Sequence, residues 1–156
     1  MIKKVILSVF VALFFSACGK LSVGVNNTPN SNFNHRGDNV PITVILYQLK
    51  DIKKFQEATE MELLEREDEI LGRDKIDSIK LQIEPEADVS ILNIDKQEVP
   101  YVGILVLYAD QNKTKIKEFK KTAEIKSDYL VFKITDKDIK ALGAKSLSVK
   151  INQKAK

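Results

Sequence analysis

The chain has 156 residues, of which 44% are apolar, 30% are charged and 7% are aromatic. This composition is typical of one globular domain and excludes both a disordered chain and a polytopic membrane protein. The 25 basic and 22 acidic residues leave a net charge of +3, which is too balanced for non-specific nucleic-acid binding. The single cysteine excludes an internal disulfide, and the single histidine weakens catalytic schemes centred on histidine.

The N-terminus has the parts of a bacterial lipoprotein signal peptide. Lys3 and Lys4 form a positive region, and Val5–Phe15 is an apolar run about half as long as the ~20 residues that span a bilayer. Small residues then precede Cys18, the only cysteine of the chain, as in the lipobox of bacterial lipoproteins. An ordinary signal peptide followed by an unrelated cysteine is the alternative. We predict removal of residues 1–17 and lipidation of the cysteine.

A lipid on Cys18 would decide where the protein is held. Each buried methylene contributes about 0.8 kcal/mol, so one acyl chain binds a membrane reversibly, whereas two or three anchor it stably. Gly19 follows the cysteine, and in enterobacterial lipoproteins only aspartate at this position signals retention in the inner membrane. We therefore predict a location on the periplasmic face of the outer membrane. Residues 18–20 would form the lipidated tether, and residues 21–156 a single domain.

The domain is predicted to begin with two strands, separated by a loop and followed by a helical insertion. Apolar residues alternate over 21–25, the period of a half-buried strand. Residues 26–40 contain six asparagines, one proline and one glycine, which favour a loop. The β-branched and aromatic run 41–49 predicts a central strand, and the apolar spacing over 51–71 predicts two to three helical turns.

Patterns of period two return after Gly72 and predict further strands. The run 101–108 is apolar on both faces, and residues 135–142 are interpreted as a helical turn. Short strands spaced about 8–12 residues apart predict an all-β fold, a two-sheet β-sandwich with a short helical insertion after the second strand. The predicted later strands are 79–83, 89–94, 101–108, 117–125 (weak), 129–134 and 147–151.

The sequence contains few candidates for a catalytic, nucleotide-binding or metal site. His35 has no histidine or cysteine partner, and the chain has no nucleotide-binding glycine motif and no nucleophile-elbow serine. Seven acidic residues surround Arg66, and a solvated helical face is favoured over a metal or carboxylate-pair site because their spacing is not that of an EF-hand. We therefore predict no catalytic residue, no metal and no cofactor besides the covalent lipid. The seven acids are Glu57, Glu60, Glu62, Glu65, Glu67, Asp68 and Glu69.

The segment from Asp110 to Thr114 reads Asp-Gln-Asn-Lys-Thr. It fits the extended acidic glycosylation sequon that some bacteria use, and it follows a predicted strand, where a loop is expected. Asn112 is therefore a candidate glycosylation site, and a chance match is the alternative.

The order of several motifs resembles a known family. A proline-led strand is followed by helical apolar positions, a Leu-Gly step and a later strand with a central glycine. In this order, and behind a lipobox, they resemble TssJ, the outer-membrane lipoprotein family of type VI secretion systems, over essentially the whole mature chain. The residues that carry the resemblance are Pro41 to Lys50 with its Tyr47-Gln48-Leu49, then Phe55, Ala58, Leu63-Leu64, Leu71-Gly72, Tyr101-Val102-Gly103-Ile104 and Tyr108-Ala109-Asp110.

The loop before Pro41 adds a further point of resemblance. In the family this loop commonly reads Asn-Pro-Asp, two residues, then Gly, with a Pro four residues later. Asn32, Gly37 and Pro41 keep this spacing. Phe33 stands in place of the family's Pro, and Asn34 in place of its Asp.

The resemblance implies a transthyretin-like β-sandwich with a helical insertion and a protruding loop after its first strand. It also implies a non-enzymatic role, in which the lipoprotein tethers the secretion complex to the outer membrane by binding the periplasmic C-terminal domain of the inner-membrane component TssM. A transthyretin-related hydrolase would need several histidines and a terminal Tyr-Arg-Gly-Ser, which this chain lacks. The other alternative is a generic periplasm-facing lipoprotein that binds a small ligand or another envelope protein. An apolar pocket with convergent polar groups would favour it.

We place the predicted partner site on the loop 26–40. Its fifteen residues exceed the two to five of an ordinary hairpin, and long loops in compact domains are usually functional or disordered. Its polar side chains suit an adaptable contact around one apolar anchor, and none of the residues 32–38 is expected in the core. A solvent loop without a partner is the alternative. The predicted contact residues are Asn32, Phe33, Asn34, Arg36 and Gly37.

The lipobox yields the first testable prediction. Cys18→Ser should block acylation and disrupt both processing and outer-membrane attachment, because a hydroxyl replaces the thiol that accepts the lipid. Membrane fractionation and labelling with a palmitate analogue measure the outcome. A substituted protein that still labels and still co-fractionates with outer membranes would show that the lipid is elsewhere.

Overall fold

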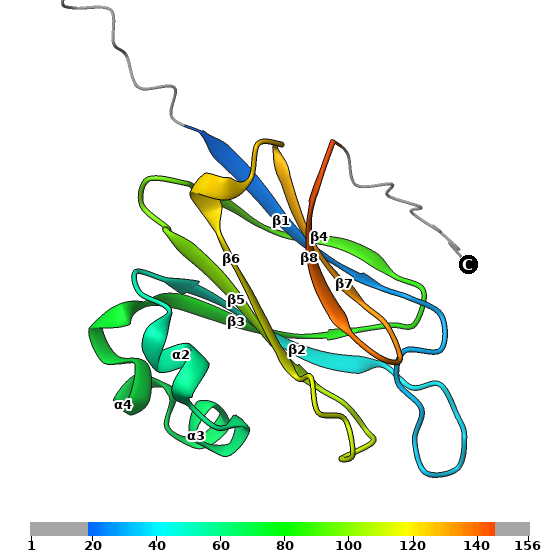
Figure 1. The fold of residues 1–156 in the computed structure, drawn as a ribbon. Helices are drawn as coiled ribbons and strands as arrows, with labels where there is room; N and C mark the ends of the chain where they lie inside the picture. Colours follow the sequence, from blue (N-terminus) through cyan, green and yellow to red (C-terminus); the bar gives the residue numbers. More distant parts are fainter. Residues whose placement is uncertain (1–18, 146–156) are drawn as a thin grey trace, which may run out of the picture.

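Residues 19–145, the part of the chain that the computed structural model describes, fold into two four-stranded sheets (Figure 1). Strand β1 pairs in parallel with β7, and the other strand pairs are antiparallel. This architecture confirms the predicted all-β sandwich. In sheet order, the first sheet contains β4 (Asp88–Asp95), β1 (Lys20–Asn27), β7 (Tyr129–Ile134) and β8 (Ile139–Ala144), and the second contains β3 (Lys75–Ile83), β2 (Ile42–Leu49), β5 (Tyr101–Leu107) and β6 (Lys117–Lys121).

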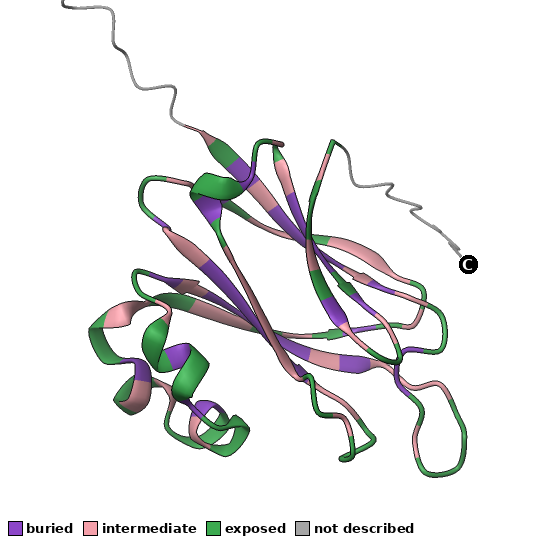
Figure 2. Cartoon of the chain, in the orientation of Figure 1, coloured by how far each residue is buried: buried purple, intermediate pink, exposed green. Residues whose placement is uncertain are grey.

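The main core lies between the two sheets. Alternate residues of β1 point into it, and Leu21, Val23 and Val25 are completely buried there. In Figure 2 the buried residues follow the strands, whereas the turns and the outer helical faces are largely exposed. The period-two pattern of the first strand therefore identified its inward face correctly.

Strands β2 and β5 are buried on both faces. Val44 and Leu46 of β2 enter the core between the sheets, whereas Ile45 and Tyr47 point to the opposite face. A strand that is apolar on both faces needs a second layer to cover the side that faces away from the main core. In this protein the helical insertion that follows β2 provides that layer (Figure 1).

The insertion, predicted as one helical segment, consists of three short helices and a 3-10 turn. They are α2 (Lys53–Glu57), α3 (Glu60–Glu65), α4 (Glu67–Leu71) and η2 (Gly72–Asp74). Helix α3 begins with a capping box, in which Glu62 N donates to Thr59 Oγ1 over 3.3 Å and Thr59 N donates to Glu62 Oε2 over 2.8 Å. This reciprocal cap starts a new helix just after α2 has ended, and so divides the insertion.

Phe55 of α2 joins the insertion to the sheet. Its ring is 1% exposed and lies 5.2 Å from the ring of Tyr47, measured between centroids. A Cβ on Gly103 of β5 would lie 2.9 Å from Phe55 Cζ, so only glycine leaves room for the ring at that position. From β6, Lys117 Nζ donates hydrogen bonds to the carbonyls of Phe55 (2.9 Å), Gln56 (3.0 Å) and Ala58, where α2 ends. Burial lowers the pKa of Lys117, and Glu62 partly opposes this shift.

Two predicted elements differ from the structure. The helical turn predicted at 135–142 is wrong: Thr135 and Asp138 close a tight turn, and Ile139–Ala144 is strand β8. The exposed edge of β7 explains the difference, because a hairpin strand there satisfies the backbone groups of β7. The weak strand predicted at 117–125 ends at Lys121 and continues as a 3-10 turn, Thr122–Glu124. The strand predicted at 147–151 lies outside the described residues, as does Cys18.

Candidate functional site

The loop between β1 and β2 is a small hydrogen-bonded hairpin. Phe33 and Asn39 form an isolated antiparallel bridge at its base. Asn34 organises the tip, because its Oδ1 accepts from the backbone N–H groups of Arg36 and Asp38, both at 2.9 Å. Gly37 has φ +82°, a backbone conformation that favours glycine. Glycine at this position of the motif therefore has a conformational reason.

The side chain of Asn32 forms hydrogen bonds that hold this loop in place. Its side-chain Nδ2 donates to the carbonyls of Val40 (3.3 Å) and Pro41 (3.0 Å), and its Oδ1 accepts from Ala109 N over 2.7 Å. Asn32 is 2% exposed, so the expectation that nothing in 32–38 belongs to the core is wrong at this residue. Its polar groups hold the β1–β2 loop against the segment after β5, and its side chain is not available for an outside partner.

The remaining predicted contact residues lie at the loop surface. Phe33 is 42% exposed, and Arg36 is exposed next to Asp38, with 3.6 Å between Arg36 Nε and Asp38 Oδ2. Asn34 is partly exposed, but its side chain is bonded within the tip. His35 is exposed at the same tip and was not among the predicted contacts. The structure thus brings Phe33, Arg36 and Gly37 together on one exposed hairpin.

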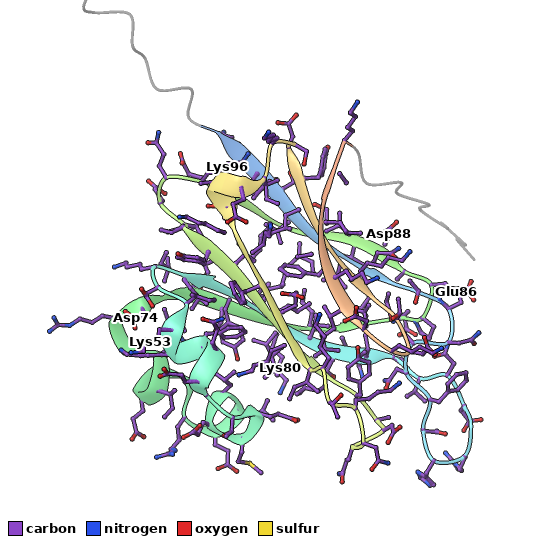
Figure 3. The ribbon with its side chains drawn as sticks, viewed as in Figure 1. Lys53, Asp74, Lys80, Glu86, Asp88 and Lys96 are labelled. Atoms are coloured by element: carbon purple, nitrogen blue, oxygen red, sulfur yellow. The ribbon has the colours of Figure 1, made fainter. Side chains whose placement is uncertain are left out.

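The N-terminal end of β1 and the β1–β2 loop lie at opposite ends of the sandwich (Figure 1). Lys96 marks the N-terminal end in Figure 3, where its backbone N–H donates to Gly19 O over 3.1 Å and its Nζ donates to Ile125 O over 2.7 Å. At the far end, β1 leads through Asn27 into the loop. The eight residues of β1 span about 25 Å, which separates the site of the predicted lipid from the loop.

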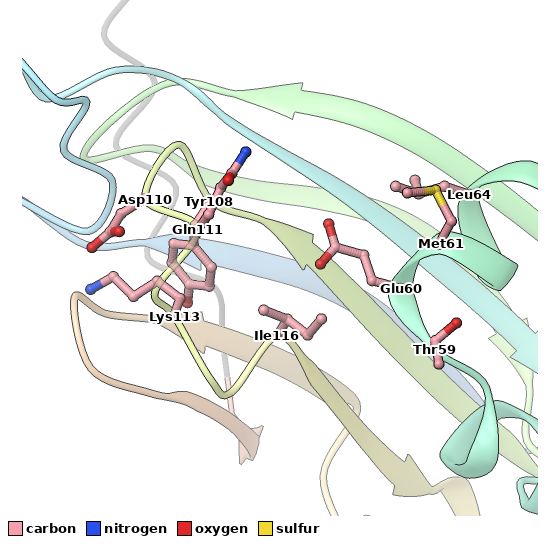
Figure 4. Close-up of a pocket in the computed structure, with 9 residues that line it drawn as sticks. All are labelled: Thr59, Glu60, Met61, Leu64, Tyr108, Asp110, Gln111, Lys113 and Ile116. Carbon is pink, nitrogen blue, oxygen red and sulfur yellow. The ribbon is translucent and has the colours of Figure 1, made fainter.

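A groove lies beside the β5–β6 loop, at the same end of the sandwich as the β1–β2 loop (Figures 1 and 4). Its volume is about 380 Å³, and it separates α3 from residues 108–116. Met61 is 61% exposed and Leu64 is 39% exposed on its helical wall. The groove is lined by Thr59, Glu60, Met61, Leu64, Tyr108, Asp110, Gln111, Lys113 and Ile116.

The groove could not be found from apolar spacing. The predicted helical pattern over 51–71 continues through Met61, Leu63 and Leu64, yet of these three only Leu63 is buried against the sheet. A helix of six residues cannot direct all three toward one layer, because neighbouring positions lie about 100° apart around its axis. The sequence does contain one signal for the groove: this helix has more apolar residues than one of its faces can bury.

Most acids of the insertion serve structural contacts. Glu67 accepts from Lys75 Nζ at 2.6 Å and from Ser78 Oγ at 2.7 Å, which ties α4 to β3. Hydrogen bonds from Thr59 lower the pKa of Glu62, and the charge of Arg66 contributes further. Within residues 19–145, no group of three His, Cys, Asp or Glu side chains could hold a metal ion, and no helix is long and apolar enough to cross a membrane.

Asn112 lies in the exposed turn between β5 and β6. Its backbone N–H and its side-chain Nδ2 both donate to Asp110 Oδ1, each over 2.9 Å. Asp110, Gln111, Asn112 and Thr114 are all exposed, so the sequon is accessible along most of its length.

Comparison with known proteins identifies the family and the fold. Residues 20–137 match the family described as type VI secretion lipoprotein, VasD, EvfM, TssJ. The fold is similar to the lipoprotein TssJ1 of Pseudomonas aeruginosa, with a TM-score of 0.72 and 17% identity over 81% of this chain and 97% of that one. It is also similar to Serratia marcescens Lip, a membrane-bound component of the type VI secretion system, with a TM-score of 0.66 and 14% identity over 79% of this chain and 96% of that one. A chain in a structure of the TssM C-terminal domain from EAEC is similar too, with a TM-score of 0.65 and 20% identity over 78% of this chain and 99% of that one. No curated protein matches the chain.

The buried side chain of Asn32 yields a stability prediction. Asn32→Ala leaves the carbonyls of Val40 and Pro41 and the N–H of Ala109 without their side-chain partner, and should lower the free energy of unfolding by about 2–3 kcal/mol. Urea denaturation of the full mature chain measures this change. His35→Ala is the matched control on the exposed tip and should stay within about 0.5 kcal/mol of the parent. Equal stabilities of the two variants would contradict the assigned role of Asn32.

The exposure of the sequon yields a second prediction. Protein purified from a source bacterium with a periplasmic oligosaccharyltransferase should carry a glycan on Asn112, and Asn112→Gln should remove it. Intact mass spectrometry decides the matter. An unmodified mass in such a host would mean that the match to the sequon is a coincidence.

Proposed function

The chain belongs to the type VI secretion lipoprotein family, and on this basis we propose that it anchors the secretion membrane complex to the outer membrane. A lipid on Cys18 holds the N-terminus in the periplasmic face of that membrane. The other end of the sandwich binds the periplasmic C-terminal domain of the inner-membrane component, TssM. The role is mechanical and involves no catalysis.

One observation supports this proposal: the start of β1, next to Cys18 in the sequence, and the exposed β1–β2 loop lie at opposite ends of one strand. Gly19 alone separates Cys18 from β1, and the exposed β1–β2 loop follows the other end of that strand (Figure 1). A protein that bridges a membrane and a partner needs its two attachment points separated and rigidly joined. Strand β1 provides both.

The position of β1 within its sheet suits a strand that transmits a pulling force. It is an interior strand, antiparallel to β4 on one side and parallel to β7 on the other. A pull along β1 loads the hydrogen bonds of both ladders in shear, so many bonds must yield together. An edge strand would be held by one ladder only.

The generic ligand-binding alternative has less support. The groove beside α3 is within the size range of small-molecule sites, about 300–1,000 Å³, but such sites bury most of their ligand. Met61, on the wall of this groove, is 61% exposed. A groove as open as this favours contact with a protein surface over enclosure of a small molecule.

The partner site can be tested with a double substitution on the loop surface. Phe33→Ser combined with Arg36→Ser removes the exposed apolar anchor and the exposed cation but keeps the buried Asn32. We expect binding to the periplasmic domain of TssM to weaken at least tenfold, equivalent to about 1.4 kcal/mol. Titration calorimetry with the lipidated chain in detergent measures this affinity.

The control for this experiment is Leu142→Ser, which removes an apolar side chain of similar exposure (45%) from β8. It should leave the affinity unchanged. Unchanged affinity in the loop variant, at an unchanged melting temperature, would move the partner site away from this loop.

A further inference from the structure

Exposed apolar side chains are concentrated at the end of the sandwich opposite the N-terminal entry. Of the five large apolar residues exposed among residues 19–145, Phe33, Met61 and Leu64 lie on the β1–β2 loop and on α3. The other two, Ile76 and Leu142, lie on separate edge strands. Clustering of exposed apolar side chains marks interaction surfaces, whereas single ones are ordinary.

The base of the β1–β2 loop is held next to the segment that forms one wall of the groove. Asn32 Oδ1 accepts from Ala109 N over 2.7 Å, which holds the β1–β2 loop against the start of the β5–β6 loop. The residues on either side of Ala109, Tyr108 and Asp110, line the groove (Figure 4). The loop that carries Phe33 and the groove therefore share one structural connection, through Asn32 and Ala109.

The helical wall of the groove is preformed. The capping box of Thr59 and Glu62 fixes the start of α3, and Leu63 is buried against the sheet at 1% exposure. From β6, Lys117 holds the carbonyls at the end of α2, immediately before this cap. Met61 and Leu64 therefore lie on a helix that is already fixed, so binding of a partner there would cost little conformational entropy.

The charged side chains that line the groove are two acids, Glu60 and Asp110, and one base, Lys113. Within residues 19–145, Glu60 has no ion-pair partner. On the opposite wall, Lys113 Nζ donates to the carbonyl of Asp136 and lies 5.5 Å from the centre of the Tyr108 ring. Lys115 is paired with Glu118 (3.0 Å) and Asp138 (2.9 Å). Glu60, on the helical wall, is thus left to attract an outside cation.

We propose that this groove is a second docking site for the partner of the proposed function, and that its occupant is a basic, amphipathic segment of that partner. An aliphatic side chain of the segment packs on Met61, Leu64 and Ile116. Its lysine or arginine side chains lie against Glu60 and Asp110 at the rim. The inference rests on the proposed function, because it assigns the groove to the same periplasmic domain that contacts the β1–β2 loop.

The test uses the lipidated full chain in detergent, titrated with the periplasmic domain of TssM. Met61→Ser combined with Leu64→Ser removes the apolar wall, and Glu60→Lys reverses a rim charge. Ile76→Ser (38% exposed in the parent) and Glu98→Lys are the matched controls, because they make the same changes on β3 and in the exposed β4–β5 turn. Because Asn112 lies beside the groove, the protein comes from a host without an oligosaccharyltransferase, and its mass is checked.

We expect the apolar double variant to bind at least tenfold more weakly than the parent, with the controls unchanged. Glu60→Lys should weaken binding about threefold at low salt, and the affinity of the parent should fall as salt is added, since exposed opposite charges are screened. Melting temperatures should stay close to that of the parent, because every substituted residue is exposed. Glu60→Lys should lower the melting temperature slightly, because Glu60 lies in the first turn of α3, where a cation opposes the helix dipole.

The outcomes separate the two proposals. If the loop variant weakens binding but the groove variants do not, the groove inference is wrong and the anchoring function stands. If the parent itself does not bind the TssM domain, both fail. Weakening in the apolar variant together with an affinity that is insensitive to salt would overturn the basic character assigned to the occupant.

Discussion

The strands β2 and β5 impose the central physical constraint on this protein, because they carry apolar side chains on both faces. One face forms the core between the sheets, and the other would be left in water without a further layer. The helical insertion after β2 covers that face with Phe55, Leu63 and Leu71, each almost completely buried. Fully burying one such side chain contributes about 1.5–3 kcal/mol, so this second layer is a substantial part of the domain's stability.

The same constraint determines where the functional surface can form. Phe55 can seat on the sheet only because Gly103 has no side chain, and Lys117 fixes the end of the helix that carries Phe55. Once this helix is in place, the capping box starts α3 alongside the β5–β6 loop, and the groove lies between them. The groove thus depends on how the outer face of the sheet is covered.

The end of the sandwich that carries the proposed contacts is held together by polar groups. Asn32 is buried and joins three backbone groups from two segments that are far apart in the sequence. A buried amide that satisfies its donors and acceptors fixes a loop geometry that apolar packing alone would leave variable. The β1–β2 loop is therefore an extension of the folded domain, joined to the strand that leads to the predicted lipid site.

Local patterns determined the main architecture. Alternation in β1, the continuous apolar runs of β2 and β5 and the helical spacing after residue 51 predicted strands, the insertion and the two-sheet fold, because burial leaves a trace in the local sequence. The run 101–108 is apolar on both faces in the sequence, and β5 is buried on both faces in the structure. The motif order, behind the lipobox, also identified the family that the comparison later showed.

Tertiary contacts decided the rest. Residues 139–144 form a strand because β7 offers an open edge, and no local period shows such an edge. Asn32 has the composition of a loop residue, yet it is buried because the backbone of Ala109, 77 residues away, supplies the partner for its amide. Met61 and Leu64 have the composition of core residues, yet they are exposed because Leu63 takes the position that faces the sheet. In each case a side chain's own chemistry allowed either environment, and only its distant neighbours in the fold decided between them.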